Sequence, residues 1–466
     1  MNKLAFCGII LKERGDGMVL QRRKNMPVVS LLSIGYLTTI LIGTILLLLP
    51  FATAEGKTSI IDALFTSTSA TCVTGLIAFD TGAHWTMFGQ IVILVLIQIG
   101  GLGFMTIITL IFMIVKRNIG LYNRTVIMQS AGSYSISDTT KLVRRIMLGT
   151  LIFEGIGVLI IYFNLRGDYP DKALYYAIFH SVSAFCNAGF DVFASGGAGS
   201  LTAFTSNPIL LFTLMGLIII GGSGFIVWSD IIDARFKYSK FQLHTKIVLI
   251  ANAFLIIIPA ILFFIFEFTT VGTNSAFSNM NFGDKIVNAL FMSVTPRTAG
   301  FNSVDVTKMT ASGQLLTTVL MLIGGNSGST AGGVKVTTIF IIVATLISSA
   351  RGQENITIFN RKLNDKVVRQ SLSLLIAYLV IIMAATLIIG SYEEATLMEI
   401  LFEVVSAIGT VGLSLGLTST CHIATKIIII FLMYIGRLGA LTLFDLLLKD
   451  RNNTFVDKPE GKVLVG

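Results

Sequence analysis

The chain has 466 residues, of which 54% are hydrophobic and only 13% are charged, and its mean hydropathy is +0.83. Soluble domains carry charged side chains at roughly a quarter of their positions, so this composition excludes a soluble globular protein and indicates an integral membrane protein. The net charge of +9 does not indicate a nucleic-acid partner, because the positions of basic residues in a membrane protein matter more than their sum. The four cysteines stand singly and give no spacing for a metal, redox or disulfide site.

The chain begins with a basic segment, residues 1–27, whose apolar run at 4–11 is too short to cross a bilayer. Eight apolar runs of spanning length follow, at 28–49, 88–115, 146–163, 208–228, 247–266, 315–348, 372–389 and 423–448. An even number of spans places both termini on the same side of the membrane. Residues 450–466 form a C-terminal tail.

Four related polar loops lie between paired runs. Each loop ends in a glycine followed by Leu or Phe, and the glycines stand 114, 111 and 112 residues apart: Gly75, Gly189, Gly300 and Gly412. A near-constant period over four copies defines an internal repeat, with units at 28–117, 118–240, 241–366 and 367–449. A short amphipathic run precedes each loop, at 60–70, 172–184, 282–294 and 398–407. The predicted unit is therefore a span, a short helix, a loop and a second span.

The loops are too polar to face lipid. Non-helical backbone at membrane depth is tolerated only where protein buries it or where it lines a water-filled path. Four such loops around one axis present a ring of backbone carbonyls that can replace the hydration shell of an ion, and glycine permits the dihedrals that turn carbonyls inward. The alternative, that the glycines only allow close helix packing, does not explain four polar loops in register. The predicted selectivity filter is Val73, Thr74, Gly75, Asn187, Ala188, Gly189, Thr298, Ala299, Gly300, Thr410, Val411 and Gly412.

We therefore predict an all-α integral membrane protein whose four tandem helix–pore-loop–helix repeats are arranged pseudo-fourfold around a central ion pore. Of the 34 Lys and Arg residues, 25 lie at the termini or between repeats, seven lie on the loop side, and Lys335 and Arg437 lie inside spans. Such an excess marks cytoplasmic segments. Both termini are expected in the cytoplasm, and the four loops are expected to face outward.

Each second span carries a cluster of glycines, at 99–104, 220–225, 323–328 and 435–439. Close packing or a kink explains the first two clusters. In the third repeat, residues 324–333 are too small and polar to continue a lipid-facing helix, so we predict an intramembrane loop that gates the path. In the fourth repeat an arginine replaces a glycine, and a charge inside the membrane indicates function. The predicted gate is Gly324, Gly325, Asn326, Ser327, Gly328, Ser329, Thr330 and Arg437.

Two arginines have alternative interpretations. Arg437 either contacts carbonyls and hydroxyls of the 324–333 loop or pairs structurally with an acid such as Glu403. Arg297 precedes a filter residue, and it either braces the loop through Asp305 or Glu403 or faces the outer vestibule. We favour bracing, because a free cation there would repel incoming cations.

Two further polar residues lie within predicted helices. Glu154 is interpreted as a hydrogen-bond partner between helices, with a proton-linked site as the alternative. His180 is interpreted as a packed, hydrogen-bonded histidine rather than a ligand.

These features resemble the Trk/Ktr/HKT superfamily of cation transporters, and most closely the membrane subunit of bacterial Ktr potassium-uptake systems. The resemblance covers nearly the whole chain from Val28, and it rests on the four loops, on the segment 324–335 and on Arg437. It implies a transporter in the bacterial plasma membrane, with potassium bound by filter carbonyls and gated by the intramembrane loop. Gly75 stands where sodium-selective plant relatives carry serine, which implies potassium. The resemblance also implies a homodimer, a cytoplasmic nucleotide-binding ring as regulatory partner, and sodium as a candidate activator.

Two other classes of protein are weighed against a pore. The stretch Gly221-Gly-Ser-Gly224 fits the motif of intramembrane serine proteases, but such an enzyme needs a histidine facing the serine, and the four histidines lie near predicted membrane faces or loops. An alternating-access cation symporter also uses broken helices and midplane sites, usually built from two-fold repeats. A four-fold repeat favours the central pore and a protein that is not an enzyme.

Overall fold

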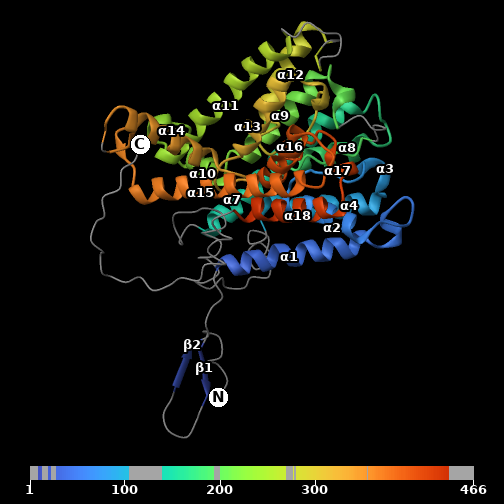
Figure 1. The fold of residues 1–466 in the computed structure, drawn as a ribbon, viewed down its shortest axis with the longest axis horizontal. Coiled ribbons are helices and arrows are strands. Elements are labelled where there is room, and N and C mark those ends of the chain that lie inside the picture. Colours follow the sequence, from blue (N-terminus) through green and yellow to red (C-terminus); the bar gives the residue numbers. More distant parts are fainter. Residues whose placement is uncertain are drawn as a thin grey trace.

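The computed structural model describes residues 9–12, 19–22, 28–103, 139–193, 200–268, 276–277, 280–353 and 355–439, and these are mostly helical (Figure 1). Each of the four predicted first spans is a long helix that is apolar enough to cross a bilayer. These helices are α1 (Val28–Leu47), α7 (Thr139–Leu165), α11 (Leu243–Phe268) and α15 (Asp365–Gly390).

A helix of 13 residues precedes each of the four polar loops, as the sequence predicts: α2 (Ile60–Cys72), α8 (Ala173–Phe185), α12 (Phe282–Val294) and α16 (Leu397–Gly409). At 1.5 Å per residue these helices span about 20 Å, which is too short to cross the hydrocarbon core. Thr396 and Glu399 form a capping box at the start of α16, and the Ser59 hydroxyl accepts a hydrogen bond from Asp62 N at the start of α2. The C-terminal half of each helix is buried, so all four point into the protein.

Two of the second spans are interrupted within the described residues, and in the other two the described part is one helix that ends before a glycine. The second spans comprise α4 (Met87–Leu102), α9 (Pro208–Gly222) with α10 (Phe225–Asp233), α13 (Ala311–Leu322) with α14 (Val336–Ala350), and α18 (Ile423–Leu438). The predicted span at 208–228 is bent, because α9 and α10 meet at an angle of 87°, and of the two interpretations of its glycine cluster the kink is the one present. In the third repeat the span breaks into a loop at 323–335, as predicted.

Three of the second spans share one backbone conformation at a glycine next to a helix end. Gly103, Gly224 and Gly439 have φ of 84°, 99° and 90° and ψ of 133°, 134° and 133°. These dihedrals lie outside the regions that residues with a Cβ populate. Glycine at this point therefore allows the chain to leave the helix at the same place in repeats one, two and four.

Shorter elements connect the helices. They are α3 (Thr81–His84), α17 (Leu417–Thr420) and the 3-10 turns η1 (Pro50–Ala52), η2 (Thr202–Phe204), η3 (Tyr238–Lys240) and η4 (Val306–Lys308). Two antiparallel hairpins qualify the predicted all-α class: β1 (Ile9–Lys12) pairs with β2 (Val19–Arg22), and β3 (Thr357–Ile358) pairs with β4 (Arg361–Lys362). Ile9 lies opposite Arg22, and Thr357 lies opposite Lys362.

The core is formed where the short helices pack between spans. One large cluster joins α2, α4, α7, α8 and α9, and another joins α1, α13, α15, α16 and α18. In Figure 1 the spans α1, α15 and α18 run in roughly the same direction across the view, with α3 and α17 toward one end and α10 and α14 toward the other. The broken second spans thus approach one end of the molecule, and the connections that follow the polar loops approach the opposite end.

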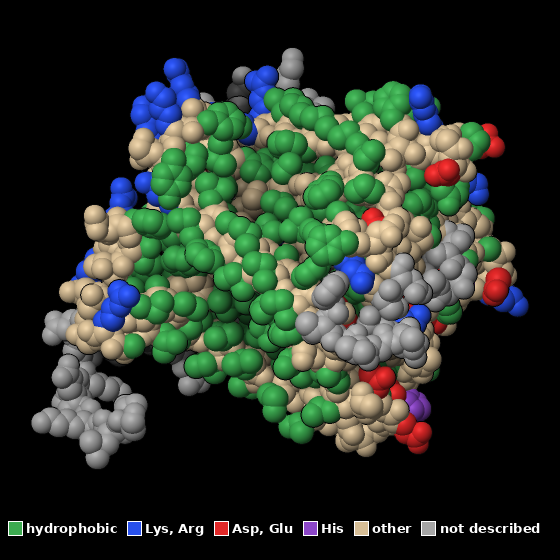
Figure 2. Space-filling model, turned by 90° about the horizontal axis from the view of Figure 1, so that it is seen from above, with side chains coloured by type: hydrophobic (Ala, Val, Ile, Leu, Met, Phe, Trp, Pro, Cys, Tyr) green, Lys and Arg blue, Asp and Glu red, His purple; other side chains and the backbone are tan. Residues whose placement is uncertain are grey.

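Exposed apolar side chains cover the long helices. Large hydrophobic residues of α1, α7, α11 and α15 are more than a third exposed, and Figure 2 shows a broad apolar surface on one face of the molecule. Such a surface fits contact with lipid, since a soluble monomer rarely exposes one so large. By length and composition four described helices can cross a membrane, or five when the bent pair α9–α10 is one span. The count of eight spans stays a prediction.

Several predicted features lie outside the described residues. They are the ends of the spans at 88–115 and 423–448, the basic connection around 118–138 and the tail at 450–466. The predicted repeat boundaries at 117/118 and 449/450 fall there as well.

Candidate functional site

Hydroxyl groups near the ends of the short helices fasten the four loops. Ser69 Oγ and Ser406 Oγ accept hydrogen bonds from Gly75 N and Gly412 N, each at 3.1 Å. In the other two repeats the direction reverses: Ser183 Oγ donates to Phe190 O, and Thr295 Oγ1 donates to Phe301 O, each at 2.7 Å. These residues are not among the predicted site residues, although Ser69, Ser183 and Ser406 each stand six residues before the glycine of their loop.

Each loop adopts the same two left-handed residues. The filter glycines Gly75, Gly189, Gly300 and Gly412 all have positive φ, between 68° and 96°. The first predicted filter residue of each loop is also left-handed, with φ of 58°, 58°, 77° and 52° at Val73, Asn187, Thr298 and Thr410. Side chains with a Cβ rarely adopt this conformation, so four occurrences at equivalent positions indicate a backbone held in one required shape.

The four glycines abut one another in a cycle. A Cβ built on Gly75 would collide with Ala188 O, and one on Gly189 would lie 2.7 Å from Ala299 O. A Cβ on Gly300 would collide with Val411 O, and one on Gly412 would collide with Thr74 O. Each loop therefore meets the carbonyl of the next loop, and the fourth meets the first. The cycle thus joins eight of the twelve predicted filter residues, the last two of each loop.

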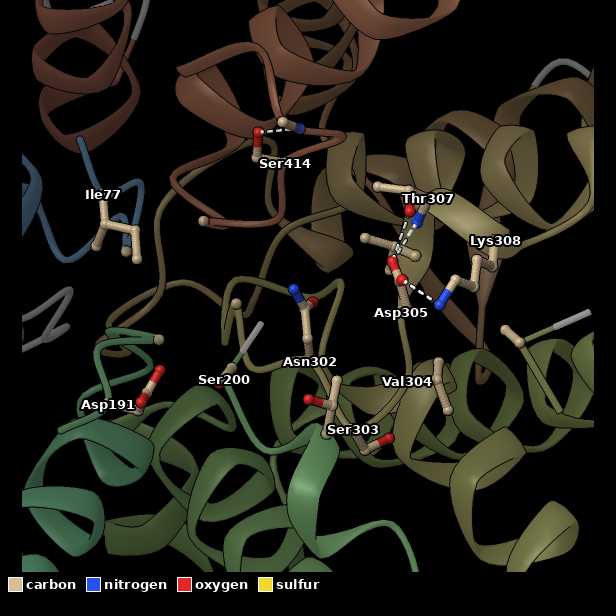
Figure 3. Close-up of a pocket in the computed structure, with 18 of the residues that line it drawn as sticks. Ile77, Asp191, Ser200, Asn302, Ser303, Val304, Asp305, Thr307, Lys308 and Ser414 are labelled. Carbon is tan, nitrogen blue, oxygen red and sulfur yellow. Dashed lines mark hydrogen bonds and ion pairs between the residues drawn. The ribbon is translucent and has the colours of Figure 1, made fainter. Parts of the chain in front are cut away.

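A pocket with a volume of about 550 Å³ opens directly onto this ring (Figure 3). All four filter glycines line it, together with polar side chains that include Asp191, Asn302 and Ser303. Asp305 sits at the pocket with its carboxylate bonded to Thr307 and paired with Lys308 at 3.2 Å. Burial, followed by the nearby Asp80 carboxylate, raises the pKa of Asp191 to about 7. Asp191 is not among the predicted site residues, although it stands only two residues after a filter glycine.

The predicted gate loop packs against the other side of the ring. A Cβ on Gly332 would collide with the Thr410 side chain, and one on Gly333 would lie 3.1 Å from Gly409 O. Thr330 Oγ1 donates to Phe185 O, the last residue of α8, at 3.3 Å. Lys335 Nζ donates to Ala331 O at 2.7 Å and to Gly332 O at 3.2 Å. The loop is thus folded on itself and lies next to the filter loops of the second and fourth repeats.

Arg437 bridges two repeats. Its Nη1 donates to Thr330 O in the predicted gate loop, and its Nη2 donates to Gly100 O and Gly101 O at the end of α4. The prediction that Arg437 contacts carbonyls of the loop is confirmed. The alternative pair with Glu403 is wrong, because Glu403 accepts hydrogen bonds from Ser414 and Thr418.

Arg297 braces its loop, but through a different partner from the predicted carboxylates. The residue is buried, with 7% of its surface exposed, so the outer vestibule is excluded as its place. Its Nη1 donates to Asn252 Oδ1 at 2.6 Å. Neither Asp305 nor Glu403 is the partner; sequence reasoning missed Asn252 because nothing marks a single asparagine in the apolar helix α11.

Two further predictions concern buried polar groups. Gln98 Nε2 donates to the Glu154 carboxylate at 3.1 Å, which joins α4 to α7 and confirms the hydrogen-bonded role. His180 Nδ1 lies 2.7 Å from Tyr176 O, and its ring stacks on Phe193 with centroids 4.1 Å apart. Neither Glu154 nor His180 lines the pocket in front of the glycines.

Comparison with known proteins places the chain in a family. A sequence model of the TrkH family, described as a cation transport protein, matches residues 32–451. The chain belongs to the TrkH family of cation transport proteins. Members of this family are membrane transporters and not enzymes, so the protease alternative is removed.

Two relatives of known name align along almost their whole length. The potassium/sodium uptake protein NtpJ of Enterococcus hirae is 39% identical over 95% of this chain and 98% of the relative. The Ktr system potassium uptake protein B of Bacillus subtilis is 38% identical over 96% of this chain and 100% of the relative. The crystal structure of the potassium transporter TrkH from Vibrio parahaemolyticus shares the fold, with a TM-score of 0.70 and 18% identity over 92% of this chain and 86% of that chain.

Proposed function

We propose that this TrkH-family protein takes up potassium through a central pore whose selectivity filter is the ring of four loops. The main observation that supports this proposal is the cycle in which each filter glycine meets a carbonyl of the next loop. A ring of fixed carbonyls replaces the water that the ion sheds. Relatives named for potassium uptake, at 38% and 39% identity, support potassium as the ion. The four repeats are then arranged pseudo-fourfold around the pore.

The outer pocket is the entrance of this pore. It opens onto all four glycines and carries the Asp191 carboxylate in its wall. A negative charge inside a cleft with low-dielectric walls raises the local concentration of cations. Potassium is therefore collected in front of the filter before it loses its water.

The loop at 324–330 and Arg437 form the gate. The continuation of this loop, Gly332 and Gly333, lies against Thr410 and Gly409 beside the ring, and Arg437 links Thr330 of the loop to the end of α4. A guanidinium on the path of a cation raises an electrostatic barrier, and the loop itself blocks the path. Movement of the loop away from the ring would remove the steric block and take Arg437 out of the path. A name that presents the relative from Bacillus subtilis as part of a Ktr system supports a regulatory partner, which we propose to be a cytoplasmic nucleotide-binding ring.

The protein works as a homodimer in the bacterial plasma membrane, with both termini in the cytoplasm and the filter loops outside. The excess of Lys and Arg between repeats supports this orientation. Sodium acts as an activator, and the potassium/sodium name of the relative from Enterococcus hirae supports a role for that ion.

Rubidium uptake into proteoliposomes tests the filter. Gly75→Ser places a side chain where a Cβ collides with Ala188 O and where φ is +88°, so the ring must distort. We expect potassium to compete strongly with rubidium in the intact protein, and sodium to become an effective competitor in the variant. Gly155→Ser is the matched control, because a Cβ there meets nothing within 4 Å. Equal competition profiles in all three proteins would remove the filter assignment.

A further inference from the structure

The bend between α9 and α10 is filled by the candidate gate loop. At the end of α9, Gly222 O accepts hydrogen bonds from Asn326 N at 3.1 Å and Asn326 Nδ2 at 3.0 Å, and Gly221 O accepts one from Thr330 N at 3.4 Å. At the start of α10, Phe225 N donates to Gly328 O at 2.8 Å. The loop thus satisfies both broken helix ends, whose backbone groups have no partner within their own helix.

The docked loop and a straight helix compete for the same atoms. In a continuous α-helix, Gly221 O and Gly222 O would accept from the amides four residues later, which belong to Phe225 and Ile226. Here the loop takes both carbonyls and the Phe225 amide. A straighter α9–α10 segment would therefore release the loop, and a released loop would favour the straighter segment, because unpaired backbone groups are costly at membrane depth.

Trp228 fastens the bend from the side of α10. Its indole Nε1 donates to Ile220 O at 3.1 Å and to Ser223 Oγ at 2.9 Å, both across the bend in the last turn of α9. The ring also packs against Phe153, Phe185 and Phe225, with centroids 5.2 to 5.8 Å apart. One side chain thus links the orientation of α10 to the end of the short helix α8 and to the bend.

The far end of α10 is tied to neighbouring spans. Arg145 of α7 bonds both carboxylate oxygens of Asp233, each at 2.7 Å. Asp230 accepts a hydrogen bond from Gln242 N, just before α11, at 2.9 Å. A displacement of α7 or α11 at this end of the molecule is therefore carried by α10 to the bend.

We propose that the α9–α10 bend is the docking site, or receptor, that holds the gate loop in its closed position. Trp228 is the residue that positions this docking site. This inference rests on the proposed function of the loop as a gate. Arg437 then holds the loop from the fourth repeat, and the bend holds it from the second. Release of the loop requires that α10 turn relative to α9.

Two substitutions loosen the receptor without removing a residue of the loop. Gly224→Ala places a Cβ 2.9 Å from Ser327 O at a φ of +99°, and Trp228→Phe removes the two indole hydrogen bonds but keeps an aromatic ring. We measure rubidium flux in proteoliposomes of the full chain without any cytoplasmic partner. Loss of one hydrogen bond of ordinary strength shifts the equilibrium about fivefold, so basal flux should rise about fivefold or more in each variant. Gly216→Ala in α9 is the control, because its Cβ meets nothing within 4 Å.

Two further measurements distinguish release of the gate loop from a general structural defect. The potassium concentration that halves rubidium flux should not change in either variant, because the filter is untouched. The chain has two tryptophans, so in a Trp85→Phe background the fluorescence of Trp228 reports its environment, and Gly224→Ala should shift that emission whereas Gly216→Ala should not.

Arg437→Gln separates failure of this inference from failure of the gate. If Arg437→Gln raises basal flux while Gly224→Ala and Trp228→Phe stay within twofold of the intact protein, the receptor is not at the bend. If none of the three variants raises flux, the gate assignment itself fails, and the inference fails with it. A rise in all three, with unchanged potassium competition, supports the proposal.

Discussion

The guanidinium of Arg297 is held by the side-chain amide of Asn252, with Nη1 and Oδ1 2.6 Å apart. Arg297 immediately precedes Thr298 in the third filter loop. Arg297 Nε has no partner among the described residues. A buried charge with an uncharged partner is costly, and it persists here next to Thr298, whose φ is +77°. The arginine therefore ties the filter to the first span of its own repeat, α11, instead of neutralising an acid.

Asn252→Ala is expected to destabilise the protein. It leaves the buried Arg297 guanidinium without its hydrogen bond, which costs about 1–3 kcal/mol. Asn252→Asp places a carboxylate at the same position and is expected to restore or exceed the original stability. Thermal unfolding in detergent ranks the stability of the parent protein and the two variants. A variant Asn252→Ala as stable as the parent would contradict the brace.

Potassium affinity is expected to fall at acidic pH through Asp191. Burial, followed by the Asp80 carboxylate, raises the pKa of Asp191 to about 7, so the group is mostly ionised above pH 7 and mostly neutral below it. As pH falls through 7, the pocket loses its negative charge and the KM for rubidium uptake rises. Asp191→Asn should show the higher KM at every pH, with a flatter profile. An unchanged profile in Asp191→Asn would assign the pH dependence to another group.

Selectivity is expected to depend on the hydroxyls that fasten the loops. Ser406→Ala removes the acceptor of Gly412 N, a bond of about 1 kcal/mol, so the preference for potassium over sodium should fall about fivefold. Competition of the two ions against rubidium measures this ratio. Ser391→Ala is the control, because its hydroxyl donates to Ile388 O at the exposed end of α15, away from the residues that line the pocket. Equal effects of the two substitutions would argue against a role of the hydroxyl in the filter.

Two ion pairs on the chain should contribute unequally to stability. Lys426 of α18 and Asp62 of α2 are 2.7 Å apart, with side chains only 14% and 12% exposed, so Asp62→Asn should cost about 3 kcal/mol by leaving a poorly solvated ammonium. Lys308 and Asp305 lie at an exposed site, so Lys308→Met should cost under about 1 kcal/mol. Chemical or thermal unfolding of both variants gives the comparison. A larger loss for Lys308→Met would reverse this ranking.

Much of the fold could be predicted from local sequence. The four long first helices, the four 13-residue helices and the interruption at 324–333 follow from runs of apolar residues, from their amphipathic spacing and from polar residues where a span should continue. The glycine cluster that contains Gly224 left a kink and close packing as alternatives, and the sequence could not decide between them, because the cluster is also compatible with straight, closely packed helices. What stabilises the bend is a loop from another repeat, about a hundred residues away in sequence.

The sequence by itself determined the internal repeat, the positions of the four polar loops and the interruption at 324–333, because near-constant spacing in four units leaves few arrangements that bury four polar loops. Only the tertiary structure decided the partners of individual polar groups. Arg297 binds Asn252, Glu403 binds Ser414 and Thr418, and Arg437 also reaches Gly100. The physical reason is that a buried charge or carbonyl is satisfied by whichever group packing brings within about 3 Å, and that choice depends on how separate repeats meet.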